Sequence, residues 1–211
     1  MIVPMRAETA AQEPKKLTSK GLATRARILE NAAELIHANG VAATNNEQLR
    51  RISGISGSQL NHYFPTKESL VLAVIEWQAE RVMNFYGSEQ FAGFDNIDAL
   101  RAWVDYYVGH EGAYRDGCTL GSLASQIIKS DLDVHDELSR AFDRWRDIFR
   151  DGLQRMRDLG RINADADPMQ LADLLLAAFQ GGMLLTQARR DVTPLKNALT
   201  AAIDHVESFA N

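Results

Sequence analysis

The sequence lacks several features that mark particular classes of protein. It holds a single cysteine, Cys118, so neither an intramolecular disulfide nor a cysteine-based zinc site can form. No uninterrupted apolar run reaches the roughly 18 residues that cross a bilayer, and residues 1–17 contain no apolar stretch typical of a secretory signal. We therefore expect a cytoplasmic protein without a membrane partner. The 45% hydrophobic and 24% charged residues are ordinary for a globular chain and exclude extensive disorder.

Catalytic and cofactor-binding motifs are also missing. There is no glycine-rich phosphate loop and no nucleophile elbow, and His110-Glu111 has no second histidine at the spacing of a zinc protease. The acidic residues around His135 have no matching ligands further along the chain, and we expect one of them, Asp133, to cap a helix. The apolar stripes offer almost no cluster of titratable groups. The sequence therefore predicts a protein that is not an enzyme and uses neither a cofactor nor a metal.

Charge is distributed unevenly along the chain. The formal net charge is −5, but residues 1–67 alone carry +4 and the remaining residues carry −9. Such an asymmetry is typical of a basic, nucleic-acid-binding head joined to an acidic body. A chance distribution of charge over solvated helix faces would produce the same totals, so the choice depends on the motifs.

Apolar residues recur at three- and four-residue spacing through most of the chain, and no segment alternates with period two, which predicts an all-α fold. Residues 1–20 are polar and are expected to form a flexible arm. A first helix should begin at Thr24 and end at Gly40. Longer helices are expected over residues 67–86, 96–109, 119–129, 134–159, 168–190 and 194–209.

Two short helices are predicted between the first helix and residue 67. Thr44 and Glu47 form the pattern of a capping box, and the helix that they open should bury Ile52 and end at Gly54. Ser56 should cap the next helix, which a proline ends. Three short helices with a tight turn between the second and third have the dimensions of a helix-turn-helix.

Residues 57–63 meet the demands that the major groove places on a reading helix. Leu60 can anchor the helix from within while short polar and aromatic side chains point outward. Gln59 and Asn61 can each read adenine through two hydrogen bonds, and Lys67 can contact a phosphate. The residues assigned to contact with a double-stranded DNA operator are Thr44, Asn46, Ser56, Gly57, Ser58, Gln59, Asn61, His62, Tyr63 and Lys67. The alternative is a helical hairpin that packs on the body and binds nothing.

Residues 24–76 resemble the DNA-binding region of the TetR family of bacterial repressors. The resemblance is carried by Ala43-Thr44, Gly54-Ile55-Ser56, Leu60, His62-Tyr63-Phe64-Pro65 and Lys67-Glu68. Four residues depart from the family pattern and leave the base preference open: Arg50, Ser53, Ser58 and Asn61. The resemblance implies an N-terminal three-helix helix-turn-helix domain joined to a larger helical domain. That larger domain would hold a small-molecule pocket and dimerise through its last two helices.

The sequence of the body agrees with a dimer. Residues 171–185 are apolar nearly all round, which indicates burial on more than one side. Gly181-Gly182 lies within that helix, where each glycine costs about 1 kcal/mol relative to alanine, and a close helix crossing would explain the cost. The residues assigned to the dimer interface are Leu171, Leu175, Gly182, Leu195, Leu199 and Ile203. The alternative is that this segment is the central helix of a monomer.

Aromatic residues on the apolar faces of separate body helices predict a cavity for an apolar or aromatic effector. The residues assigned to it are Trp103, Tyr106, Tyr107, Cys118, Trp145, Phe149, Phe179, Gln180 and Met183, although ordinary core packing would explain any single one. Cys118 is similar to the cysteine of a Gly-Cys-Pro-x-Gly-x-Leu-Ala segment in one TetR subgroup, with Thr119 in place of the proline. A thiol at a helix amino end can have a lowered pKa and react, whereas a buried cysteine would be inert.

These observations predict an arm over residues 1–20, a DNA-binding domain over 21–67 and an effector-binding and dimerisation domain over 68–211. The expected function is that of a homodimeric, ligand-responsive regulator of transcription, a repressor that a small molecule releases from a near-palindromic operator. The alternative is a constitutive DNA-binding regulator controlled by a protein partner or by oxidation or alkylation of Cys118.

Overall fold

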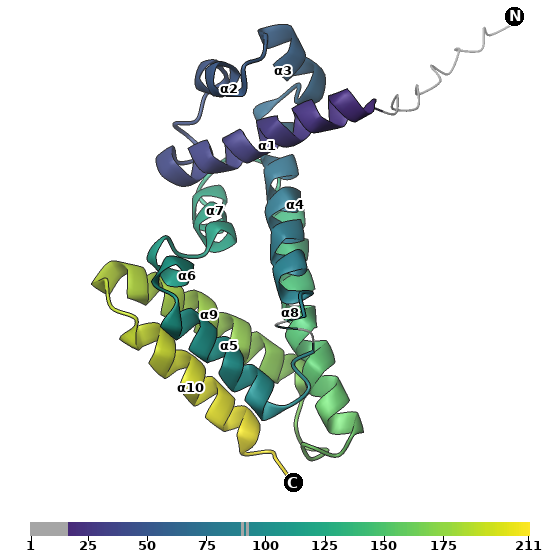
Figure 1. Cartoon of the computed structure of the whole chain (residues 1–211), viewed down its shortest axis with the longest axis vertical. Coiled ribbons are helices and arrows are strands. Elements are labelled where there is room, and N and C mark those ends of the chain that lie inside the picture. The colour runs from purple at the N-terminus through teal and green to yellow at the C-terminus, as the bar shows by residue number, and fades with distance from the viewer. Residues whose placement is uncertain (1–16, 90, 92) are drawn as a thin grey trace, which may run out of the picture.

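The computed structural model describes residues 17–211 apart from 90 and 92, and within these residues the chain is all-α, as predicted. Figure 1 shows a small head of three helices joined by one long helix to a larger body. The helices are α1 (Ser19–Asn39), α2 (Asn46–Ser53), α3 (Gly57–Tyr63), α4 (Lys67–Tyr86), α5 (Ile97–Gly109), α6 (Glu111–Arg115), α7 (Thr119–Ile127), α8 (His135–Asp158), α9 (Pro168–Arg189) and α10 (Thr193–Glu207).

The first helix begins earlier than the sequence predicted. Thr18 caps α1 by accepting a hydrogen bond from the backbone N–H of Gly21 at 3.2 Å, so the last residues of the expected 1–20 arm are helical. The rest of that arm, residues 1–16, lies outside the described residues. The helix ends at Gly40, whose φ of 88° favours glycine.

The start of α2 corrects two expectations. Asn45, rather than Thr44, is the N-cap, since its side chain accepts from the N–H of Gln48 at 3.0 Å. In this register Ser53 is buried and accepts a hydrogen bond from the Asn31 amide of α1. Ile52, one residue earlier on the helix, is turned away from α1 and is 46% exposed instead of buried.

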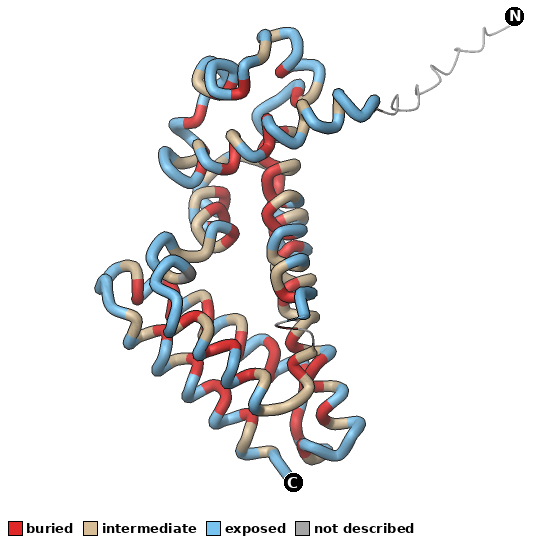
Figure 2. The backbone as a smooth tube through the Cα atoms, viewed as in Figure 1, coloured by how far each residue is buried: buried red, intermediate tan, exposed pale blue. Residues whose placement is uncertain are grey.

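Helix α4 connects the head to the body, and α8 packs along it (Figure 1). Thr66 and Ser69 form a capping box at its amino end, with reciprocal hydrogen bonds of 3.0 and 3.1 Å. On the outer side, Arg144 of α8 binds Glu76 and Glu80 of α4. Figure 2 shows buried residues along the inner side of α4, which continue the core from the head into the body.

The body is built mainly from α5, α8, α9 and α10, with α9 packed against both α8 and α10. Two details differ from the prediction. The short helix α6 was not anticipated. In addition, α8 starts after Val134 with no side-chain cap, so Asp133 does not cap it.

The close crossing expected at Gly181-Gly182 exists, but within one chain. A Cβ on Gly182 would lie 2.9 Å from the Cα of Leu195 in α10, whereas a Cβ on Gly181 would meet nothing within 4 Å. All six residues assigned to the dimer interface are buried in the protomer's own core. This corrects the assignment, because a buried side chain has no surface to offer a second copy.

Helix α9 bears on the expectation that no segment of the chain spans a membrane. By length and composition alone it is apolar enough to cross a bilayer, and it is the one such helix among the described residues. Since α8 and α10 cover two of its sides, the apolar sequence is explained as that of a core helix. Its uncovered side exposes Leu174, Leu184 and Leu185.

Candidate DNA-binding head and effector cavity

Ser56 caps helix α3, as predicted, and Gln59 completes a capping box that the sequence analysis did not anticipate. The Ser56 hydroxyl accepts from the N–H of Gln59 at 3.2 Å, and Gln59 Oε1 accepts from the N–H of Ser56 at 2.9 Å. Leu60 is 1% exposed and anchors the helix to the head, with Phe64 buried just beyond the helix end. The turn before it depends on Gly54, whose φ of 62° is left-handed.

The outward face of α3 carries most of the side chains assigned to DNA. Ser58, Gln59, Asn61 and His62 are exposed, while Tyr63 is half-buried. Because the carbonyl oxygen of Gln59 is engaged in the cap, this side chain is not free to bind a base with both polar atoms. The Asn61 side chain is exposed and forms no hydrogen bond with any described residue. Of the two side chains expected to read adenine, Asn61 is thus the one whose amide is not engaged within the described part of the chain.

The remaining assigned residues lie beside this face. Ser56 and Asn46 are exposed at the starts of α3 and α2, and Gly57 is half-buried. Thr44 is 6% exposed and donates its hydroxyl hydrogen to the carbonyl oxygen of Gly40, so it braces the loop before α2 instead of facing solvent.

Lys67 lies at the first turn of α4 and is exposed. Its ammonium group donates to the carbonyl oxygen of Ala42 at 3.3 Å. This contact ties the start of α4 to the loop between α1 and α2, and a phosphate that binds Lys67 would compete with it.

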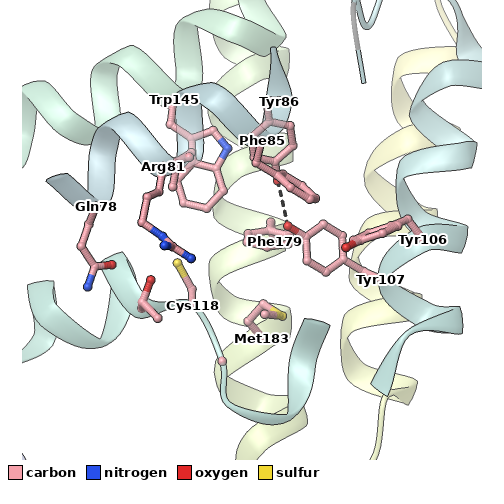
Figure 3. Close-up of a pocket in the computed structure, with 13 residues that line it drawn as sticks. Gln78, Arg81, Phe85, Tyr86, Tyr106, Tyr107, Cys118, Trp145, Phe179 and Met183 are labelled. Atoms are coloured by element: carbon pink, nitrogen blue, oxygen red, sulfur yellow. Dashed lines mark hydrogen bonds between the residues drawn. The ribbon is translucent and has the colours of Figure 1, made fainter. Parts of the chain in front are cut away.

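A cavity of about 240 Å³ lies in the body between α4, α5, α7, α8 and α9 (Figure 3). Six of the nine assigned residues line it: Tyr106, Tyr107, Cys118, Trp145, Phe179 and Met183. Trp103 and Phe149 do not, because both are fully buried behind the wall with their rings 4.9 Å apart. Gln180 lies on the far side of Cys118 and lines a neighbouring groove.

One whole wall of the cavity was not predicted. It comes from α4, and the missed residues are Gln78, Arg81, Val82, Phe85 and Tyr86. The sequence did contain a signal for this wall. Gln78 falls three residues after Ile75 on the buried face of α4, and it is 5% exposed, so a polar residue interrupts an otherwise apolar stripe.

Two tyrosine hydroxyls meet at the inner end of the cavity. The Tyr86 and Tyr107 oxygens lie 3.2 Å apart (dashed in Figure 3), and the Trp103 indole N–H donates to Tyr86 at 3.1 Å. Burial raises the pKa of both phenols well above the usual value of 10.0, so both stay neutral. The buried indole N–H of Trp145 has no partner among the described residues.

Cys118 is the N-cap residue of α7 and does not have the lowered pKa that its position suggested. Burial raises the pKa of its thiol, and this outweighs the hydrogen bonds from the Gln180 amide at 3.4 Å and the Gly121 N–H at 3.2 Å. Of the two possibilities left open by the sequence, the raised pKa agrees with the buried cysteine and not with the reactive thiolate. The absence of a side chain at Gly121 leaves room for the Gln180 side chain, whose terminal oxygen would lie too close to a Cβ at that position.

Comparison with known proteins relates both parts of the chain to one family. Residues 28–74 match the profile described as bacterial regulatory proteins, tetR family, and residues 96–202 match the one described as tetracyclin repressor-like, C-terminal domain. The chain is 24% identical over 182 residues to the uncharacterized HTH-type transcriptional regulator YxaF of Bacillus subtilis, and the match covers 85% of this chain and 92% of YxaF.

A second relative and a solved structure extend this comparison. The chain is 31% identical over 88 residues to the HTH-type transcriptional repressor DhaR of a Mycobacterium species, a match that covers 42% of this chain and 44% of DhaR. A crystal structure of a TetR transcriptional regulator from Chloroflexus aurantiacus has a TM-score of 0.76 at 24% identity, covering 92% of this chain and 98% of that one. This likeness shows a shared fold.

Proposed function

Because the chain belongs to the TetR family of bacterial transcriptional regulators, we propose that it is a homodimeric repressor that a small molecule releases from its operator. The observation that carries the proposal is the position of α4. Its amino end is tied to the DNA-binding head, and residues of its later turns form one wall of the aromatic cavity. A ligand in that cavity would therefore touch the same helix that packs against α1 of the head.

The head supports sequence-specific binding to the major groove. The short helix α3 is capped at its amino end by Ser56 and anchored by Leu60, and it presents Ser58, Asn61 and His62 to solvent. In a two-fold dimer, two such helices would reach successive major grooves about 34–36 Å apart on a near-palindromic operator. The relative DhaR is described as a repressor, which agrees with this direction of control.

The uncovered face of α9 supports dimerisation. Leu184 is 66% exposed and Leu185 is 49% exposed, on a helix whose other sides are already packed. With Leu174, they give this side of α9 an exposed apolar surface, and contiguous surfaces of this kind mark interaction sites. We place the dimer contact there, outward of the buried residues that the sequence suggested.

Release would follow from linkage between the two sites. A ligand that binds the DNA-free arrangement of α4 better than the DNA-bound arrangement lowers the affinity for the operator by the same factor. The cavity also reaches the head through α7, which begins beside Cys118 and ends near α1. There, Gln126 Oε1 accepts a hydrogen bond from the Val41 N–H at 2.6 Å.

The proposal is tested by fluorescence anisotropy of the full chain on the DNA upstream of its own coding region and on a random duplex, at two salt concentrations. We expect tight, sequence-preferring binding with two subunits per site. Weak binding to both duplexes that falls alike with salt would contradict the proposal, because it would show charge attraction alone.

A further inference from the structure

The charge of the cavity lining is one-sided. Among the described residues that line it, Arg81 alone carries a formal charge and none carries a carboxylate. Tyr86, Tyr107 and Cys118 are held neutral, since burial raises the pKa of each. A cationic ligand would therefore find no counter-charge here and would meet a fixed positive charge.

Arg81 forms a cation–π contact and no ion pair with any of the described residues. Its guanidinium group lies 4.7 Å from the centre of the Trp77 ring, a cation–π contact that orients the side chain. Figure 3 shows it extending from α4 toward Cys118. Glu30 and Glu34 of α1 line the adjacent groove, which shares Arg81, but neither carboxylate forms an ion pair with it in the described structure.

A second arginine beside the same helix shows the contrast. Arg144 reaches α4 from α8 and is neutralised by two glutamates, Glu76 at 2.9 Å and Glu80 at 2.6 Å. Glu76 and Glu80 thus pair with the arginine outside the cavity, and Arg81 has no carboxylate partner in the part of the chain that the structure describes. An anion that enters the cavity would find an oriented guanidinium with its hydrogen-bond donors available.

The rest of the cavity suits an aromatic ring. Phe85, Tyr107 and Phe179 form its walls, and the Tyr107 and Phe179 rings meet edge to face with centroids 4.8 Å apart. At the edge of the cavity, the indole N–H of Trp145, which has no partner among the described residues, would donate a hydrogen bond to a ligand. The side-chain amide of Gln78 could donate or accept one. Drug-sized ligands occupy roughly 300–1,000 Å³, so a cavity of about 240 Å³ favours a smaller molecule.

We propose that the effector is a small aromatic acid, such as an aryl carboxylate, with its anionic group at Arg81 and its ring between Phe85, Tyr107 and Phe179. This inference rests on the proposed function, because it names the class of ligand that the regulator answers to. A neutral aromatic compound is the competing ligand class, and the experiment below separates the two.

The experiment compares three compounds of similar size: 2-naphthoate, 2-naphthamide and 2-naphthylmethylammonium. Each is titrated into the full-length protein by isothermal calorimetry. We expect 2-naphthoate to bind about tenfold more tightly than the amide, because a charge-assisted hydrogen bond is added, and the ammonium compound to bind most weakly. Equal affinity for acid and amide, stronger binding of the ammonium compound, or no binding of the acid would overturn the proposal.

Two variants locate the effect. In Arg81→Gln the preference for acid over amide should disappear, since the variant removes the charge that distinguishes the two probes and leaves the aromatic walls in place. Arg189→Gln removes an equal charge from an exposed site outside the cavity and should keep the full preference. If Arg81→Gln retains the preference, the anionic group binds elsewhere and the inference is wrong.

The operator complex distinguishes failure of this inference from failure of the proposed function. Compounds of other classes are added to that complex alongside the three probes. Release by a neutral or cationic compound, with no preference for the acid, would overturn the ligand class and leave the repressor proposal standing. Tight, Arg81-dependent binding of 2-naphthoate with no release of DNA by any compound would support the ligand class and contradict ligand-controlled repression.

Discussion

At the residue scale, the structure distinguishes polar side chains that hydrogen-bond within their own chain from those whose polar atoms are available to DNA. The side-chain oxygen of Gln59 accepts a hydrogen bond that caps α3. The side chain of Asn61, on the same face, forms no hydrogen bond with a described residue. Thr44 is likewise turned inward to Gly40. Residue type alone cannot reveal such local competition for a polar atom, because Gln and Asn at these positions look equally able to read a base.

The variant Asn61→Ala should lose about 1–3 kcal/mol of discrimination between the operator and a random duplex, and its melting temperature should not change.

The variant Gln59→Ala should have a lower melting temperature, because it removes half of a capping box worth about 1 kcal/mol. Lys67→Ala should weaken binding to both duplexes similarly. Anisotropy and thermal denaturation measure the two quantities, and equal loss on both duplexes in Asn61→Ala would remove that residue from base reading.

The Cys118 thiol should react slowly with iodoacetamide at neutral pH. Its pKa is raised above 9.0 in the folded chain, so the thiolate is scarce there and the rate should climb only in alkaline solution. Above about pH 9 the unfolded chain releases the thiol proton while the folded chain still holds it. The contribution of Cys118 to the free energy of unfolding therefore falls as pH rises through about 9. Native alkylation at pH 7 as fast as in denaturant would contradict this and would revive the alternative of control by alkylation.

At the element scale, each helix is explained by what it packs against. The apolar circumference of α9 arises from α8 on one side and α10 on another, and Gly182 lets α10 approach. The same close approach makes two adjacent glycines unequal, although the sequence presents them as a pair.

The change Gly182→Ala should destabilise the fold by about 1–3 kcal/mol, since its Cβ would lie 2.9 Å from the Cα of Leu195 and would force α9 and α10 apart. Its neighbour is the matched control. Gly181→Ala meets no atom within 4 Å and should be neutral or stabilising by up to about 1 kcal/mol. Urea denaturation measures both, and equal effects would show that the crossing is not as close as described.

At the scale of the whole molecule, the hydrophobic period predicted the all-α architecture and most helix bounds, because burial on one face repeats along the chain. The errors have local causes. Ile52 was misplaced because the helix starts at a different cap, and Asp133 because no side chain caps α8. The α4 wall of the cavity was missed because which helix closes a cavity depends on the packing of α4 on α8, which sequence spacing does not encode.

Dimerisation through the outer face of α9 predicts that Leu184→Glu yields a monomer in sedimentation velocity, because a charge is placed at the centre of the contact. Leu159 is a comparably exposed leucine, 62% against 66%, at the end of α8. The control variant Leu159→Glu should remain a dimer. A monomeric Leu159→Glu, or a dimeric Leu184→Glu, would place the interface elsewhere.

The central claim is that a ligand in the body changes how the two heads are spaced. The most direct test measures the distance between two spin labels, one in each subunit of the dimer. Each label is attached to the cysteine of the variant Arg51→Cys, at an exposed position of α2. The wild-type chain measures background labelling of Cys118. Double electron–electron resonance should give one narrow label-to-label distance when the dimer is bound to the operator. It should give a different distance when the tightest-binding naphthyl probe occupies the cavity. An unchanged distance distribution with and without that bound probe would contradict the account.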